Sequence, residues 1–176
     1  MELRDGDLEL GPWREEDART VYDACQDPEI QRWIPVIPRP YTIEDALAFV
    51  RGEAVPDITH SFAIKESGAV VGAIGMRVNH RSRTGQLGYW CVPWARGRGL
   101  TTRALWVLCR HGLEQLQLGR LELVTDPDNS ASQRVAEKVG FRREGLLRSH
   151  LVHPDGRRRD SVMFSLLPGE LATPGS

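Results

Sequence analysis

Two arginines and two glycines alternate in the segment Arg96-Gly97-Arg98-Gly99-Leu100-Thr101, and this spacing is typical of a turn that holds an anion. Glycine lets the backbone approach a ligand closely, and the first amide N–H groups of a following helix have no partners within that helix. Together with the helix dipole these amides favour a diphosphate, and the two arginines add positive charge. Considered alone, the segment is explained about as well by an exposed basic turn.

The segment differs from two better-known phosphate-binding motifs. A dinucleotide-binding GxGxxG fingerprint requires a glycine at position 102, where this sequence has Thr102. A Walker A loop requires Gly-Lys-Ser/Thr, which does not occur here. The sequence therefore supports neither a dinucleotide-binding Rossmann domain nor a P-loop ATPase.

A second polar segment, Asp126-Pro127-Asp128-Asn129-Ser130-Ala131-Ser132, follows the strand-like run 121–125. The Asn129 amide can donate and accept at once, and Ser132 falls on the first turn of a helix predicted over 130–139. Simple capping of that helix is the plainer interpretation of the segment alone. If strand 121–125 runs parallel to its neighbour, however, both polar segments meet at the carboxyl ends of the strands and frame a slot.

The elements that position these segments follow from hydrophobic periodicity. Strand-like patterns cover residues 8–10, 61–65, 69–78, 86–92, 121–125, 146–152 and 161–166, and helical patterns cover 13–26, 42–50, 101–113 and 130–139. This order predicts an α+β domain whose mixed, mostly antiparallel seven-stranded sheet is flanked by about four helices. Strands 86–92 and 121–125 form its parallel pair, because a helix connects them.

Composition is that of one ordinary globular domain. The chain has 176 residues, a net charge of -1 and 40% hydrophobic residues. Three cysteines without a CxxC pair and five scattered histidines predict neither a disulfide framework nor a metal site. We expect a cytoplasmic protein with no nucleic-acid or membrane partner, because the sequence has no basic excess and no long apolar run. One domain is expected over 1–168, with a flexible Pro/Gly-rich tail over 169–176.

The polar segments and their flanks resemble a known family. Leu87-Gly88-Tyr89-Trp90 and the run from Arg96 to Leu105 resemble the acetyl-CoA signature of the GNAT superfamily, Arg/Gln-x-x-Gly-x-Gly/Ala. Asp128-Asn129-Ser130-Ala131-Ser132 and Glu137-Lys138-Val139-Gly140-Phe141 resemble the second half of the same fold. The combination is similar to the branch that contains ribosomal-protein-alanine N-acetyltransferases, and the similarity extends over residues 8–167.

The resemblance implies a GNAT fold in which the parallel strands splay into a slot for acetyl-CoA, without a metal. It implies that the backbone of Cys91 and Val92 pairs with pantetheine and that amides over 96–102 hold the pyrophosphate. Asn129 would bind the pantetheine arm, and Ser132 would lie near the sulfur. A homodimer follows from family analogy only. The predicted cofactor-binding residues are Cys91, Val92, Arg96, Gly97, Arg98, Gly99, Thr101, Thr102, Asn129 and Ser132.

Three positions depart from the family pattern. Thr101 replaces the last Gly/Ala of the signature, Ala136 stands where many relatives have a tyrosine general acid, and Gln86 stands where relatives often have glutamate. We therefore predict Ser132 as the catalytic residue that supplies a proton to the departing thiolate, and the Val92 amide as support for the oxyanion. An equally weighted alternative makes Ser132 only a cofactor contact.

The expected reaction is direct attack of a primary amine on acetyl-CoA, with a protein N-terminal α-amine as the favoured acceptor. Deprotonating an α-amine of pKa about 8 near neutral pH costs under about 1 kcal/mol, against about 4 kcal/mol for a lysine amine. This difference matters because Gln86 is not a carboxylate base. Two alternatives stay open: a small-molecule amine as acceptor, with acetyl-CoA or another acyl-CoA, and a non-catalytic acyl-CoA sensor.

The acceptor side is expected at the loop 33–41 and the final hairpin, since such loops carry specificity. Within the hairpin, Arg157-Arg158-Arg159 could attract an acidic partner, although a solvated strand end explains this run more simply. His150 and His153 should point to opposite strand faces, so at most one of them lines a shared cleft. The remaining candidates for a general base are Glu66, His150, His153 and Asp160.

Overall fold

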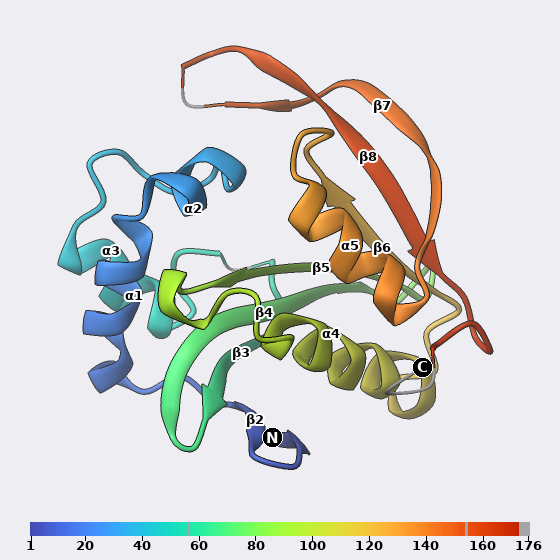
Figure 1. The fold of residues 1–176 in the computed structure, drawn as a ribbon, viewed down its shortest axis with the longest axis horizontal. Coiled ribbons are helices and arrows are strands. Elements are labelled where there is room, and N and C mark those ends of the chain that lie inside the picture. Colours follow the sequence, from blue (N-terminus) through green and yellow to red (C-terminus); the bar gives the residue numbers. More distant parts are fainter. Residues whose placement is uncertain (56, 154, 173–176) are drawn as a thin grey trace.

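The computed structural model describes residues 1–55, 57–153 and 155–172. Its single mixed sheet has eight strands in the order β1-β2-β3-β4-β5-β6-β8-β7 (Figure 1). The strands are β1 Leu3–Asp5, β2 Leu8–Gly11, β3 His60–Glu66, β4 Ala69–Asn79, β5 Thr84–Cys91, β6 Arg120–Thr125, β7 Arg142–Val152 and β8 Arg158–Leu166. The α-helices are α1 Ala18–Cys25, α2 Pro28–Trp33, α3 Ile43–Val50, α4 Leu100–Arg110 and α5 Ser130–Val139. Shorter helical turns cover Glu15–Asp17, Pro93–Ala95 and His111–Gln115.

Strands β5 and β6 pair in parallel, which confirms the prediction for these two strands. Their register runs from Thr84 opposite Arg120 to Leu87 opposite Leu123. The pairing stops there, while β5 continues to Cys91 and β6 continues to Thr125. The carboxyl-terminal ends of the two strands therefore diverge and leave unpaired backbone between them.

Helix α4 connects these strands and lies across the face of the sheet, while α5 lies beside β6 (Figure 1). The helical spacing predicted for α4 is confirmed, since Ala104, Leu105 and Leu108 are fully buried. Burial of each leucine side chain stabilises the fold by about 1.5–3 kcal/mol. This packing fixes the first turns of α4 and α5 on either side of the point where β5 and β6 diverge.

The sheet has eight strands rather than the predicted seven because β1 adds to its edge. Leu3 pairs with Leu10 and Asp5 pairs with Leu8, so β1 forms a tight hairpin with β2. A three-residue strand with charged residues is too short to show an alternating pattern.

The first helical region also differs from its prediction over 13–26. It begins with a short turn at Glu15–Asp17, continues as α1 and is followed at once by α2. No helix was predicted over 28–33. Asp27 accepts hydrogen bonds from the amides of Glu29 and Ile30, and Pro28 occupies the first helical turn, so the Asp27-Pro28 dipeptide starts α2.

The expected flexible tail over 169–176 is described as far as Ala172, and residues 173–176 lie outside the described residues. The Ala172 amide donates to Val139 of α5, and its carbonyl accepts from Trp106 Nε1 of α4 at 2.7 Å. Gly140, at φ 106°, leaves room for this segment, because a Cβ there would meet the Glu170 carbonyl. The described part of the tail is thus anchored between α4 and α5.

None of the helices in the described ranges is long and apolar enough to cross a membrane.

Candidate active site

The turn before α4 has the backbone geometry expected of an anion-holding segment. Gly97 and Gly99 have φ values of 74° and 77°, a left-handed conformation that favours glycine. Gly99 is the N-cap of α4 and has no side chain with which to satisfy the first amides of the helix. The intrahelical bonding begins with Arg103, whose amide donates to the Gly99 carbonyl at 3.1 Å. Among the described residues the amides before it have no hydrogen-bond partner, an arrangement that favours an anion at a helix N-terminus.

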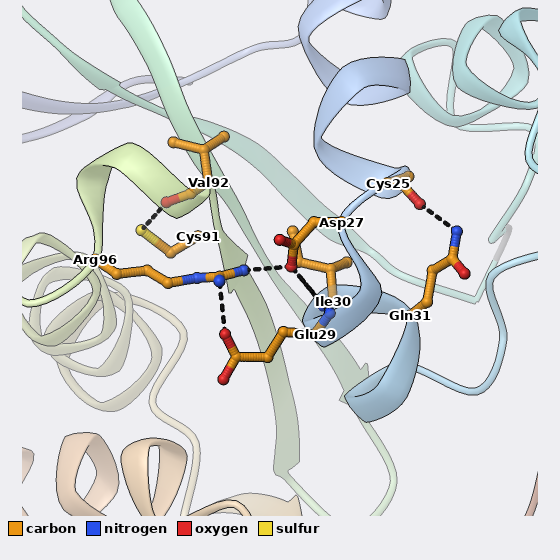
Figure 2. Close-up of polar contacts among 8 residues, drawn as sticks. All are labelled: Cys25, Asp27, Glu29, Ile30, Gln31, Cys91, Val92 and Arg96. Atoms are coloured by element: carbon orange, nitrogen blue, oxygen red, sulfur yellow. Dashed lines mark hydrogen bonds and ion pairs between the residues drawn. The ribbon is translucent and has the colours of Figure 1, made fainter.

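The arginine side chains of this turn are used differently from the expectation. Arg96 contacts Asp27 at 2.7 Å and Glu29 at 2.6 Å, both in the first turn of α2 (Figure 2). Arg98 contacts Glu66 at 2.8 Å. Carboxylates therefore already balance both guanidinium groups, whereas the first backbone amides of α4 have no hydrogen-bond partner among the described residues.

Asp27 joins the turn to α2 through a cluster of hydrogen bonds. Its Oδ1 accepts from the amides of Glu29 and Ile30 at 3.1 and 2.9 Å and also from Arg96 (Figure 2). Partial burial raises the pKa of Asp27, but the hydrogen bond from Arg96 and those from the two amides outweigh burial and hold it below its usual value. The carboxylate is therefore ionised at neutral pH and fixes α2 beside the turn.

A cavity of about 210 Å³ lies where β5 and β6 diverge. It contains six of the ten predicted cofactor-binding residues: Cys91, Arg96, Gly97, Thr101, Asn129 and Ser132. The other four, Val92, Arg98, Gly99 and Thr102, do not line it. The rest of the lining comes from α2 and its end (Glu29, Ile30, Trp33, Ile34), from β5 (Tyr89, Trp90) and from α5 (Ala131, Val135). We call this the donor cavity.

The Val92 backbone, predicted to pair with pantetheine and to support the oxyanion, is hydrogen-bonded within the protein. Its amide donates to the Val71 carbonyl at 3.0 Å and its carbonyl accepts from the Ala95 amide at 3.1 Å. In an antiparallel pair, successive residues direct their backbone groups to opposite sides. Since Val92 faces β4, Cys91 directs its N–H and C=O toward the divergent strand ends. The Val92 amide therefore already has a hydrogen-bond acceptor in β4, whereas the Cys91 backbone faces the divergence.

Asn129 caps α5, as the plainer interpretation of the sequence suggested. Its Oδ1 accepts from the Ser132 amide at 3.0 Å. The side chain also lines the donor cavity, and its NH₂ group remains a potential donor. Capping and ligand binding are therefore compatible at this residue.

Tyr89 is the residue that the sequence interpretation missed. Its hydroxyl lies 2.9 Å from Ser132 Oγ and 3.2 Å from the Ser132 carbonyl, so β5 and α5 are joined across the divergence. Burial raises the pKa of Tyr89 to about 12, although the hydrogen bond with Ser132 acts in the opposite direction. The phenol is thus protonated at neutral pH and forms a polar pair with the serine that was predicted as catalytic.

The four candidate bases occupy different surroundings. Glu66 pairs with Arg98, Asp160 accepts from the Ser149 amide at 2.7 Å, and His150 Nδ1 lies 3.0 Å from Ser161 Oγ. His153 is buried and lines a second cavity of about 270 Å³ between α2 and the β7–β8 hairpin. Of the two histidines, only His153 lines that cavity. Burial, and secondarily Arg159, lowers the pKa of His153, so the ring is neutral at pH 7.

Comparison with models of known protein families shows to which family the chain belongs. The acetyltransferase (GNAT) domain model matches residues 7–142. The chain belongs to the GNAT acetyltransferase family. It is accordingly an N-acetyltransferase, and the predicted fold with its splayed parallel pair is the GNAT fold.

Individual GNAT relatives differ in their acceptors. The chain is 32% identical over 104 residues to the putative ribosomal N-acetyltransferase YdaF of Bacillus subtilis, covering 58% of this chain and 56% of that one. It is 26% identical over 175 residues to the spermidine N(1)-acetyltransferase of Escherichia coli, covering 96% and 92%. The structure of Mycobacterium smegmatis RimJ in complex with CoA-disulfide superposes with a TM-score of 0.84 at 28% identity, covering 98% and 88%.

Proposed function

We propose that this GNAT enzyme transfers an acetyl group from acetyl-CoA to a protein N-terminal α-amine. The observation that carries the proposal is the donor cavity, which joins the divergent end of β5, the uncapped first turn of α4 and the polar first turn of α5. An extended thioester cofactor with amides along one arm and a diphosphate at the other end matches this arrangement.

For the donor, we assign the amides at the start of α4 to the pyrophosphate. The Cys91 backbone pairs with the pantetheine amides in the manner of an added strand, since it faces the divergence. The Asn129 side chain donates to the same arm through its NH₂ group. Val92 holds the end of β5 in place through its own hydrogen bonds and does not contact the donor through its backbone.

For the leaving group, we assign Ser132 and Tyr89 to protonation of the departing thiolate. When the Tyr89 hydroxyl donates to Ser132 Oγ, the serine proton is free to point to the sulfur. Transfer of that proton neutralises the thiolate, and the phenol proton passes to Ser132. The attacking amine releases its own proton to water, and water reprotonates Tyr89, whose pKa of about 12 favours the phenol at neutral pH.

The α-amine is favoured as acceptor because β5 carries a glutamine, and not a carboxylate base, at position 86. Gln86 on β5 is hydrogen-bonded to Arg77 and is not a carboxylate. An α-amine of pKa about 8 needs under about 1 kcal/mol to become neutral near pH ~7.4, whereas a lysine or polyamine nitrogen of pKa about 10.4 needs about 4 kcal/mol. Spermidine is the second candidate, because the Escherichia coli spermidine acetyltransferase is similar over nearly the whole chain.

Thiol release from acetyl-CoA, measured with a matched set of acceptors, tests the proposal. The set contains a peptide with a free N-terminus, the same peptide with a blocked N-terminus and one lysine, and spermidine. We expect the free peptide to have the highest kcat/KM and mass spectrometry to place the acetyl group on its α-amine. Faster turnover of spermidine than of every peptide would contradict the proposal, and saturable CoA binding with no acetyl transfer would instead indicate an acyl-CoA sensor.

A further inference from the structure

Helix α2 separates two cavities of different character. Its residues Glu29, Ile30 and Trp33 line the donor cavity. Pro28, Gln31 and Arg32, spaced three and four residues apart, lie on the opposite face and line the cavity of about 270 Å³ under the β7–β8 hairpin. In Figure 1 this hairpin reaches over the α2 end of the molecule. We call this second space the basic cavity.

The charges that line the basic cavity are unequal. Arg32, Arg39 and Arg159 line it together with a single carboxylate, Asp155. That carboxylate already accepts from the Arg157 amide at 3.0 Å and lies 3.8 Å from the Arg157 guanidinium. The lining of this cavity therefore carries an excess of positive charge.

Nearby carboxylates balance only one of these three arginines closely. Arg39 is held by a hydrogen bond to the Gln31 carbonyl, which is neutral. Arg32 stacks on the Trp33 ring at 4.4 Å and lies 3.9 Å from Asp128, a long and exposed ion pair. Arg159 is the exception, because it contacts Asp126 at 3.2 Å. Among the described residues Arg39 has no carboxylate partner and Arg32 has only this long contact, so both guanidinium groups can bind a further carboxylate.

A neighbouring cavity of about 500 Å³ continues toward the α5 side of the donor cavity. Arg32, Arg158 and Arg159 line it, and three aspartates, Asp126, Asp128 and Asp160, balance them. The lining of this neighbouring cavity is thus balanced in charge, whereas the lining of the basic cavity has an excess of positive charge. An anion entering between α2 and the hairpin is therefore attracted to the Arg32 and Arg39 end.

We propose that the basic cavity binds a side-chain carboxylate of the acceptor, so that the enzyme prefers N-termini followed closely by Asp or Glu. This inference rests on the proposed function and specifies its substrate class. A helix with its side chains is about 10 Å across, and an extended chain advances about 3.3 Å per residue. The acidic residue therefore falls about three residues after the acetylated amine. The same cavity disfavours a polyamine, because its remaining ammonium groups would meet arginines.

The test compares peptides that share one N-terminal residue and carry Asp, Asn or Lys at position 3 or 4. We expect the Asp peptide to exceed the Lys peptide about tenfold in kcat/KM, since a charge-assisted hydrogen bond in a partly exposed site supplies discrimination of this order. Arg39→Gln should bring the ratio close to one, and Arg39→Glu should reverse it. Arg32→Gln serves as a second variant, with folding of each checked by thermal unfolding. Arg81→Gln, an equal loss of charge in the exposed turn after β4, should leave the ratio unchanged.

A carboxylate in the basic cavity could come from the acceptor peptide or from the acyl group of the donor. Turnover of succinyl-CoA distinguishes these two sources. If Arg39→Gln lowers turnover of succinyl-CoA without changing the preference among peptides, the cavity serves the acyl group and the acceptor assignment is overturned. Equal kcat/KM for the Asp, Asn and Lys peptides also overturns it, while acetylation of all three leaves the proposed function intact. If no peptide is acetylated, the proposed function fails. In that case, calorimetry measures the affinities of the Asp and Lys peptides for the CoA-saturated protein. Tighter binding of the Asp peptide supports an acidic side chain in the basic cavity, and equal affinities overturn this inference.

Discussion

The Tyr89 hydroxyl lies 2.9 Å from Ser132 Oγ, and this contact bridges the point where two parallel strands separate. Tyr89 comes from β5, and Ser132 comes from the first turn of the helix that follows β6. Ala136, the position at which the family resemblance led us to look for a tyrosine general acid, is fully buried here. The phenol that accompanies the serine thus comes from a different element.

Removing either hydroxyl should slow the chemical step. We expect Ser132→Ala to lower kcat about 100-fold, the lower range for loss of a positioned proton donor, and Tyr89→Phe to lower it less. The KM for acetyl-CoA should change little in both variants. The double variant should resemble Ser132→Ala alone, because the two hydroxyls act through one proton path. Steady-state kinetics of the four proteins measures this, and additive losses would contradict a shared path.

Alkaline pH should destabilise the protein partly through Tyr89. Its pKa is about 10 in the unfolded chain and about 12 in the folded protein, mainly because of burial. Between these values the unfolded state releases the proton and the folded state keeps it, so stability is present below pH 10 and is lost as pH rises toward 12. A shift of two pKa units corresponds to about 2–3 kcal/mol. Urea unfolding at pH 9 and pH 11.5 should therefore show a smaller alkaline loss for Tyr89→Phe, and an equal loss in both proteins would refute this.

Gly97→Ala should weaken acetyl-CoA binding through the backbone. The φ of 74° costs a non-glycine residue about 1–2 kcal/mol, although a Cβ at this position meets no atom within 4 Å. A loop that relaxes from this conformation redirects its amides, and we expect the KM for acetyl-CoA to rise about tenfold. Gly145→Ala is the matched control, since its Cβ also meets nothing within 4 Å and its φ lies outside the left-handed region. A KM equal to that of the control would show that the turn does not depend on this conformation.

Arg96→Gln should affect both substrates. It removes the contacts to Asp27 and Glu29 that hold α2, and α2 lines both the donor cavity and the basic cavity. We expect the KM values for acetyl-CoA and for the acceptor each to rise about five- to tenfold. Arg19→Gln, which breaks an exposed pair with Asp23 on α1, should change neither. A rise confined to acetyl-CoA would mean that Arg96 acts on the donor alone.

Local sequence patterns were enough to predict most of the fold. The parallel pair, the turn before α4 and the capped start of α5 each depend on residues close together in the chain. The start of α2 was missed although its signal was local, because Asp27-Pro28 both ends one helix and caps the next. The edge strand β1 was missed because three residues carry too little periodicity.

The contacts of the site that the sequence did not predict have a different cause, since they depend on register and on distant residues. The side to which the Val92 amide points is set by the pairing of β4 with β5, which no short pattern reveals. Tyr89 meets Ser132 across 43 positions of sequence, and Arg96 meets Asp27 across 69. A tyrosine on the face of β5 shared with Leu87, near the end of the parallel pairing, was the one available signal for the Tyr89 contact.

Ala172 bonds to Trp106 of α4 and to Val139 of α5, the two helices whose opposite ends flank the donor cavity. Helices α4 and α5 also pack directly against each other, and Leu171 packs on the same hydrophobic core. Residues 171 and 172 therefore help to hold the relative position of the two helices on the side away from the cavity. The geometry of the donor cavity thus depends in part on residues that do not line it.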